Sequence, residues 1–353
     1  MRTITAILIL LCAAAQAEVP VAGPAVAQWQ PVDAVVLKFM DRLDAKAAAV
    51  AIGAGDGKPV QYSRGFGWRN QEKQKPTPPD LMFRIASVSK PFTAAVIHDL
   101  IRERRLALDT RIWDVLDIRP KAGEPADARW KDITIGQLLE HKGGFDRSQA
   151  PDPMFRMDLV QKEFALKRPP TAAEVVACNM GLPLQFAPGE KSVYSNFGYC
   201  VLGRVIEKVT GKSYYDNVAA RVCKPWGITG IALGQSKPGE HEVSYPIRED
   251  AFLIEVMDAH GGLVASAPAL CEFLQHYWIS GLPRKPGAKG YTYTFFGSLP
   301  GTTSMVRQRP DGVNCAVLFN GRRDRSIDED TKALLTEMDA AIDAIMKPRT
   351  AKP

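Results

Sequence analysis

One short segment of this chain carries more chemical information than any other: Phe83-Arg84-Ile85-Ala86-Ser87-Val88-Ser89-Lys90-Pro91. Ser87 and Lys90 are three residues apart at the start of a predicted helix over 91–106, so one helical turn places both side chains on the same face. An unassisted serine hydroxyl is a weak nucleophile, and a neighbouring deprotonated lysine can activate it. An N-capping serine beside a solvated lysine would show the same spacing, so the pattern indicates a nucleophile only with support from elsewhere in the chain.

A second candidate is Tyr194-Ser195-Asn196, which precedes a predicted helix over 197–209. A tyrosine held near a lysine can shuttle protons, and the asparagine amide can orient the lysine or a substrate carbonyl. The same residues could simply form a loop that caps the helix. Tyr215-Asp216-Asn217 repeats the pattern within an amphipathic segment, where packing is the better interpretation, so the tripeptide alone is weak evidence.

A third candidate is Phe295-Phe296-Gly297-Ser298-Leu299-Pro300-Gly301, just before a predicted C-terminal hairpin. Glycine allows the backbone to approach a ligand closely. The N–H groups of Ser298 and Ser87 could together form an oxyanion hole. Taken alone, the segment is better explained as a plain Gly-Pro turn between strands.

In this order, Ser-x-x-Lys, Tyr-x-Asn and a Gly-Ser edge strand resemble the serine β-lactamase and penicillin-binding-protein superfamily. The resemblance covers about 32–346 and is closest to the class C-like, β-lactamase-related serine hydrolases, which include esterases, D-aminopeptidases and DD-carboxypeptidases. It implies an α+β fold of the β-lactamase/transpeptidase type. Further segments that resemble the family are Ile133 to His141 followed by Gly143-Gly144, Gly261 to Ser266, Ser298 to Thr303, and Pro310-Asp311-Gly312.

The resemblance also implies a role for each matching residue. Ser87 would attack a carbonyl and become acylated, and water would later release the acyl group. Lys90 and Tyr194 would share the general-base and general-acid work. Asn196 would orient Lys90 or the substrate, while Gly297, Ser298 and Phe295 would lie against the substrate.

One position departs from the family pattern. The third motif usually begins with Lys or His two residues before the glycine, where this chain has Phe295 followed by Phe296. In family members the lysine helps to bind a substrate carboxylate, as in penicillins, whereas two phenylalanines offer apolar surface. We therefore expect weak β-lactamase activity and a preference for esters or amides without that carboxylate. Arg322 or Arg307 could replace the missing cation.

Composition and missing motifs exclude other classes. The chain has 353 residues, of which 46% are hydrophobic and 24% charged, with a net charge of +6, as in ordinary globular proteins of one large domain or two. The mild, scattered charge predicts no nucleic-acid partner. No nucleotide-binding fingerprint, metal-ligand spacing or Gly-x-Ser-x-Gly elbow occurs, so we expect no cofactor and no metal. His141 and His260 could suggest a Ser-His-Asp triad, but we expect both to be structural.

The first seventeen residues have the pattern of a secretory signal peptide, with Arg2, an apolar run and Ala15-Gln16-Ala17 as the cleavage site. We therefore predict an exported protein, periplasmic or secreted, whose later sequence contains no membrane span. Removal of the signal removes Cys12 and leaves five cysteines, an odd number, so at least one stays unpaired. Residues 18–31, rich in Ala, Pro and Val, are predicted to form a flexible leader.

The remaining chain is predicted to be one domain over 32–346, followed by a tail over 347–353. Strand signals lie near both ends and helix signals in the middle, which indicates one antiparallel sheet built from both ends of the chain and flanked by helices. We expect a sheet subdomain over about 32–90 and 255–346 and an inserted, mostly helical subdomain over about 91–254. The predicted elements are helices over 32–43, 91–106, 135–141, 172–180, 197–209, 214–222 and 327–346, and hairpins over 47–66 (turn 55–58) and 304–319.

The sequence thus predicts an exported serine hydrolase that cleaves a small ester, amide or peptide through an acyl-enzyme. A cell-wall DD-carboxypeptidase, a D-aminopeptidase and a true β-lactamase remain alternatives within the enzyme class. A catalytically inactive binding or regulatory protein on the same scaffold is the alternative from another class. The natural substrate and the oligomeric state stay open.

Overall fold

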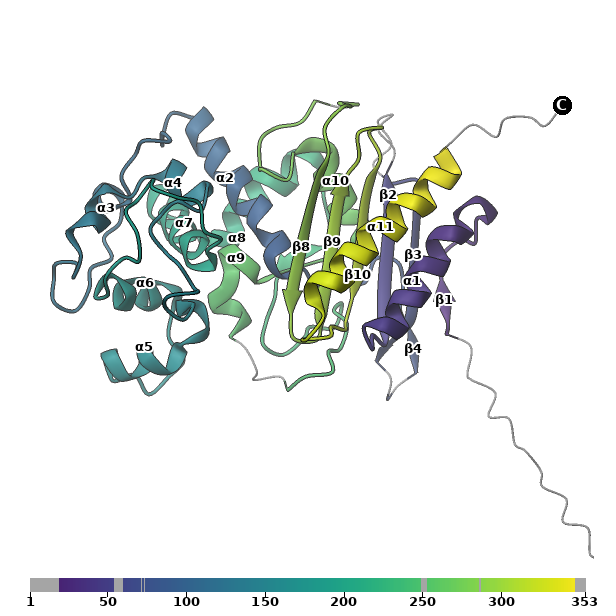
Figure 1. Ribbon diagram of the computed structural model, residues 1–353, viewed down its shortest axis with the longest axis horizontal. Helices are drawn as coiled ribbons and strands as arrows, with labels where there is room; N and C mark the ends of the chain where they lie inside the picture. The colour runs from purple at the N-terminus through teal and green to yellow at the C-terminus, as the bar shows by residue number, and fades with distance from the viewer. Residues whose placement is uncertain are drawn as a thin grey trace, which may run out of the picture.

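The computed structural model describes residues 19–53, 60–70, 72, 74–248, 253–285 and 287–346. Its main feature is an antiparallel sheet in the order β1-β3-β2-β10-β9-β8, with β4 paired to β3 (Figure 1). Strands from the two ends of the chain meet at its centre, where β2 pairs with β10, as predicted. The strands are β1 (Val21–Ala22), β2 (Ala47–Gly53), β3 (Tyr62–Asn70), β4 (Lys75–Pro76), β8 (Tyr293–Leu299), β9 (Thr302–Gln308) and β10 (Asn314–Phe319).

Strand β2 is buried on both faces because helices cover both sides of the sheet. Ala48, Val50 and Ile52 belong to the core under α1 (Gln30–Arg42) and α11 (Ile327–Met346). The alternate residues Ala47, Ala49 and Ala51 belong to the core that contains α10 (Ala267–His276), as the two-residue period of a strand requires.

The middle of the chain is mostly helical, as predicted, and lies beside the sheet (Figure 1). A small second sheet, which the sequence did not predict, joins the two parts; it consists of β5 (Phe83–Arg84), β7 (Leu263–Ala265) and β6 (Ile231–Leu233). Strands this short leave little periodicity to detect. The helices here are α2 (Lys90–Arg102), α3 (Ile112–Val115), α4 (Ile135–Leu139), α5 (Met157–Phe164), α6 (Ala172–Met180), α7 (Asn196–Thr210), α8 (Tyr214–Asn217), continued by a π-helix (Val218–Cys223), and α9 (Asp258–Gly261).

The prediction of a flexible leader over 18–31 is wrong for the residues that the structure describes. Val21–Ala22 pairs with β3, and helix α1 already begins at Gln30. Trp29 is only 2% exposed and stacks on Tyr62, with ring centroids 5.3 Å apart. An edge strand of two residues and one buried aromatic anchor this segment, and neither produces a sequence pattern.

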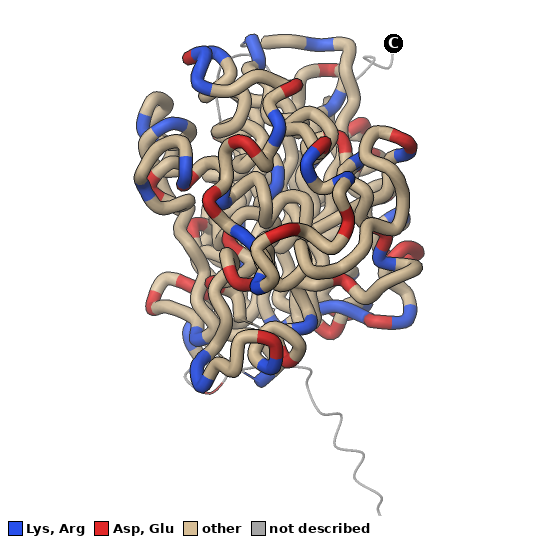
Figure 2. The backbone as a smooth tube through the Cα atoms, turned by 90° about the vertical axis from the view of Figure 1, so that its left-hand side faces the viewer, with Lys and Arg blue, Asp and Glu red and all other residues tan. Residues whose placement is uncertain are grey.

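Several other predictions fall on residues outside the described ranges, namely the signal peptide, the tail over 347–353 and the hairpin turn 55–58. Within the described ranges, no helix is long and apolar enough to cross a membrane. The described cysteines are all free thiols: Cys178 is partly exposed, and Cys200, Cys223, Cys271 and Cys315 are buried. Figure 2 shows basic and acidic residues interspersed over the face that it presents, consistent with the mild net charge.

Candidate active site

The nucleophile segment runs from β5 into helix α2 through a 3₁₀ turn over Ala86–Ser89. Ala86 has a φ of +47°, a left-handed conformation that costs a non-glycine residue on the order of 1 kcal/mol. Ser87 is partly exposed, while its neighbours Ala86 and Val88 are buried. The strained turn therefore presents the Ser87 hydroxyl at the surface of an otherwise buried segment.

Lys90 lies one turn after Ser87, and its side chain is buried. Its Nζ is 3.2 Å from Ser87 Oγ, 2.8 Å from Asn196 Oδ1 and 2.9 Å from the His260 carbonyl oxygen. Burial lowers the pKa of Lys90 well below its usual value. A neutral amine has two N–H groups for the two carbonyl oxygens and one lone pair for the Ser87 hydroxyl. The geometry thus suits a neutral lysine that accepts a proton from Ser87.

Tyr194 approaches the same hydroxyl from the segment before α7. Its phenol donates a hydrogen bond of 2.7 Å to Ser87 Oγ, and its ring centroid lies 4.8 Å from Lys90 Nζ. Burial raises the pKa of Tyr194 to about 12, and the hydrogen bond to Ser87 opposes this shift. The phenol is therefore protonated at neutral pH, so it can donate a proton and cannot readily accept one.

Asn196 is held by a carboxylate that the sequence analysis did not identify. Its Nδ2 donates to Asp152 Oδ2 at 2.8 Å, which fixes Oδ1 toward Lys90. Asp152 also caps a 3₁₀ turn by accepting from the Met154 N–H. An Asp-Pro pair in a loop is typical of such a cap, so the sequence contains no signal for this second role.

Two charges act on Lys90 in opposite directions. The carboxylate of Asp152 raises the lysine's pKa, whereas the guanidinium of Arg147, whose Cζ lies 5.4 Å from the Tyr194 ring centroid, lowers it. Both effects are smaller than that of burial, which is the largest cause of the shift. The net result is a lysine that loses its proton more readily than a solvated one.

Strand β8 runs directly beside the nucleophile segment. The hydroxyl of Ser304, on β9, donates to the Ile85 carbonyl at 2.8 Å and so ties the sheet to this segment. A Cβ on Gly297 would lie 2.0 Å from the same carbonyl oxygen, far inside van der Waals contact. Glycine is therefore required here, because strand β8 lies against the backbone of the nucleophile segment.

The aromatic residue that faces the pocket is Phe296 and not Phe295. The pocket beside Ser87 is lined by Phe296 and Ser298, which are two residues apart and lie on the same face of β8. Phe295 lies on the other face and packs against the buried core. The structure thus places Phe296, and not Phe295, among the residues that line this pocket. The role of either side chain in substrate binding stays a prediction.

Of the two arginines considered as substitutes for the missing cation, the structure places Arg322 at the site. Its Nη1 donates to Ser298 Oγ at 3.2 Å, and its Nε donates to Asp324 at 2.8 Å. Arg307 instead pairs with Asp339 of α11 at 2.6 Å. Arg322 lines the pocket that contains Ser87, so a cation is available at the end of β8.

Both candidate histidines are held in structural contacts. His141 Nδ1 accepts the Ser195 N–H at 3.2 Å, and burial lowers the pKa of His141 to about 4. His260 contributes its main-chain carbonyl to Lys90, and its buried imidazole has a pKa well below the usual value. Ser87 Oγ is hydrogen-bonded to Lys90 and Tyr194, so the geometry favours a lysine-assisted serine over a triad.

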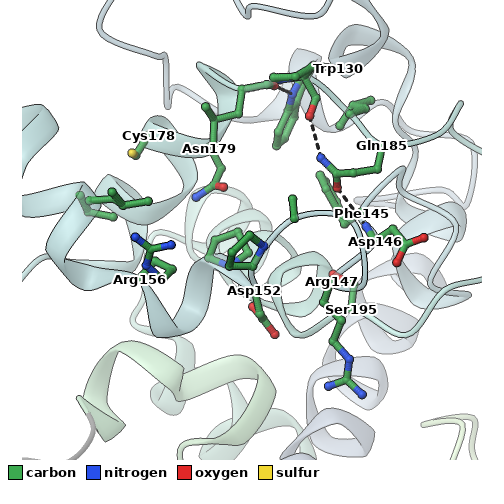
Figure 3. Close-up of a pocket in the computed structure, with 18 of the residues that line it drawn as sticks. Trp130, Phe145, Asp146, Arg147, Asp152, Arg156, Cys178, Asn179, Gln185 and Ser195 are labelled. Atoms are coloured by element: carbon green, nitrogen blue, oxygen red, sulfur yellow. Dashed lines mark hydrogen bonds between the residues drawn. The ribbon is translucent and has the colours of Figure 1, made fainter.

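A second pocket lies next to the pocket of Ser87, within the helical part of the chain (Figure 3). Arg147 and Tyr194 line both pockets. Across the residues that the structure describes, no group of three or more His, Cys, Asp or Glu is placed to hold a metal ion.

The site consists of a partly exposed serine, a buried lysine, a tyrosine and an asparagine, which are joined by hydrogen bonds. It lies between the edge of the sheet and the helical part of the chain. This arrangement is that of the serine hydrolase class. The model of the beta-lactamase family matches residues 32–313. The chain belongs to this family.

Curated relatives have differing names. The esterase EstB of Burkholderia gladioli is 31% identical over 241 residues, which are 63% of this chain and 57% of the esterase. A probable fimbrial assembly protein, FimD of Dichelobacter nodosus, is 33% identical over 59% of this chain and 52% of its own length. The chain thus spans about half the length of the curated relatives it matches.

Solved structures show the same fold. The D-amino acid amidase of Ochrobactrum anthropi SV3 superimposes with a TM-score of 0.70 over 89% of this chain and 98% of the amidase, at 19% identity. The penicillin-binding protein homologue of Pyrococcus abyssi superimposes with a TM-score of 0.63 over 87% and 77% of the two chains, at 21% identity. These likenesses confirm the predicted β-lactamase/transpeptidase fold.

Proposed function

We propose that this protein hydrolyses a small ester or amide through an acyl-enzyme on Ser87. The observation that carries the proposal is the bonding of Lys90, whose Nζ faces two carbonyl acceptors and the Ser87 hydroxyl from a buried position. In the first step Ser87 Oγ forms a bond to the substrate carbonyl carbon, and its proton passes to Lys90. The bond to the leaving alcohol or amine then breaks, and the leaving group takes up a proton.

The contrasting pKa shifts divide the acid and base roles. Lys90, whose pKa is lowered, serves as the base, and Tyr194, whose pKa is raised to about 12, serves as the acid for the leaving group. Lys90, which lies beside Tyr194 at Ser87 Oγ, then returns its proton to the Tyr194 phenolate. Water then attacks the acyl carbon, the acid is released, and Ser87 regains its proton. The N–H groups of Ser87 and Ser298 stabilise the oxyanion in both steps.

An ester is the preferred substrate in this proposal, supported by the similarity to an esterase and by the apolar Phe296 at the pocket. A substrate with a carboxylate is the second candidate, because Arg322 lies at the end of β8 beside Ser298. Turnover of β-lactams is expected to be weak, since the third motif lacks its own cation. We also propose that the protein is exported, on the signal pattern of residues 1–17.

Covalent labelling tests the proposal. The protein is incubated with a fluorescent alkyl phosphonate and examined by mass spectrometry, with Ser87→Ala as the test variant and Ser280→Ala, at an exposed serine away from the pocket, as the control. We expect one adduct per chain, lost only in Ser87→Ala. Labelling that persists in Ser87→Ala contradicts the nucleophile assignment, and a chain that takes no label supports the inactive binding protein instead.

Rates with different substrates then identify the substrate class. Short p-nitrophenyl esters, D-alanyl peptides, D-amino acid amides and nitrocefin are compared under the same conditions. We expect the esters to be cleaved fastest. Nitrocefin turnover at rates typical of a dedicated β-lactamase contradicts the proposed preference.

A further inference from the structure

The second pocket has a largely apolar wall and lies against the catalytic tyrosine. Figure 3 shows its lining residues, which come from the loops around 145–153 and 182–185 and from α5 and α6. The cavity has a volume of about 120 Å³, comparable to the ~150 Å³ of an apolar cavity that holds benzene. The apolar lining consists of Trp130, Phe145, Leu159, Val160, Leu182 and Leu184, with prolines between them.

Polar side chains in this wall already have partners within the protein. Gln185 accepts from the Asp146 N–H at 3.0 Å and donates to the Pro183 carbonyl at 2.8 Å. Asn179 donates to the Val175 carbonyl at 2.9 Å. The carboxylate of Asp146 accepts from Ser148 and Gln149. Because these groups already have hydrogen-bond partners within the protein, the pocket gains little from a polar occupant and favours an apolar one.

The pocket is connected to the catalytic serine by shared walls. Tyr194 and Arg147 line both this cavity and the pocket of Ser87, and the Tyr194 phenol is 2.7 Å from Ser87 Oγ. In Figure 3 the guanidinium of Arg147 and the carboxylate of Asp152 point out of the cavity in the same direction. An apolar group attached to Ser87 would reach the cavity beside Tyr194 and Arg147, the two residues that line both pockets.

We propose that this cavity, defined here as the acyl pocket, receives the hydrocarbon end of the substrate's acyl group; the proposal rests on the proposed function. The leaving group must depart before water attacks, and the pocket at Ser87 is the more open of the two. The acyl group stays until hydrolysis, so the more enclosed cavity fits the part that remains. The acyl pocket thus selects medium-length or aromatic acyl groups over acetyl.

A chain-length series of p-nitrophenyl esters measures this selection. Each methylene that enters the acyl pocket is expected to raise kcat/KM about fourfold. Asn179→Phe, whose new ring would occupy the space into which the Asn179 side chain points, should remove this gain for hexanoate and leave acetate nearly unchanged (Figure 3). Leu182→Trp, at a half-exposed wall residue, provides a second variant if the first does not fold. Leu108→Phe, at an exposed leucine that does not line either pocket, is the matched control.

A second measurement does not depend on turnover. Cys178 lines the acyl pocket and is partly exposed, whereas the other described thiols are buried, so a thiol reagent should label Cys178 first. Burial raises the pKa of this thiol, and labelling is therefore performed at mildly alkaline pH. Protein carrying an octylphosphonyl group on Ser87 should label at Cys178 at least about fivefold more slowly than protein carrying an ethylphosphonyl group.

The outcomes separate the two proposals. If neither phosphonate attaches to Ser87, the proposed function fails. If both attach but Cys178 labels equally fast in the two adducts, and hexanoate shows no advantage over acetate, the acyl pocket is refuted and the serine hydrolase assignment stands. Slower labelling with the octyl adduct, together with loss of the hexanoate gain in Asn179→Phe but not in Leu108→Phe, supports the acyl pocket.

Discussion

Replacing Gly297 with alanine tests how closely strand β8 must approach the nucleophile. The added Cβ would lie 2.0 Å from the Ile85 carbonyl oxygen and 2.3 Å from Ser304 Oγ. Cβ atoms essentially never come within 3.0 Å of another heavy atom, so β8 and the nucleophile segment must separate by at least 3.0 − 2.0 = 1.0 Å. This movement weakens the Ser304 bond to Ile85 and shifts Ser298, which lines the pocket of Ser87.

A misplacement of about 1 Å can reduce the rate by about 100-fold, and overpacking of this kind costs about 1–3 kcal/mol of stability. We expect Gly297→Ala to lower kcat/KM by about that factor while the protein stays folded. The assay is p-nitrophenyl ester hydrolysis together with phosphonate labelling of Ser87 and thermal unfolding. Gly239→Ala is the control, because a Cβ at Gly239 would meet nothing within 4 Å. Activity of Gly297→Ala within twofold of the unmodified protein refutes the argument.

Three further predictions concern charge and packing. Activity should rise with pH as Lys90 loses its proton, at a pH well below the usual lysine range, and should persist until Tyr194 ionises near pH 12 or the protein unfolds; a pH–rate profile of kcat/KM tests this. Asp152→Asn removes a charge that raises the Lys90 pKa and should shift the acidic limb to lower pH, whereas Arg147→Gln should shift it to higher pH; shifts in the same direction refute the assignment of these charges. Trp29→Ala should cost about 3–5 kcal/mol in urea unfolding, because it empties a buried aromatic site, while specific activity of the folded fraction is unchanged; an unaltered midpoint contradicts this role.

The sequence predicted the large elements well, because the spacing of apolar residues in a long helix or strand shows which face is buried. The helices over 172–180 and 327–346 have the predicted bounds, and the pairing of β2 with β10 follows the predicted sheet from both ends. The short strands β1 and β5 were missed, since two residues show no period. Tertiary contacts alone define such strands.

Within the site, the sequence predicted the contact between residues that are one helical turn apart. Ser87 and Lys90 come together as their spacing indicates, and Tyr194 meets them through the fold that the resemblance implied. Asp152 could not be predicted, because its partner Asn196 is far away in sequence. The choice between Phe295 and Phe296 depended on which face of β8 is buried, and a strand partly exposed on both sides does not reveal this in its pattern.

The meeting of the chain's two ends at the centre of the sheet also determines when the site can exist during folding. The Ala47 N–H bonds to Asn320 Oδ1 across 273 residues, and β9, which holds the nucleophile segment through Ser304, can join the sheet only with β10. Contacts this distant in sequence form slowly. A chain still emerging from the ribosome has Ser87 and Lys90 long before it has strand β8 beside them. In the proposed function, hydrolytic capacity is therefore acquired only after β10 has been synthesised, and a chain truncated before β10 should remain inert.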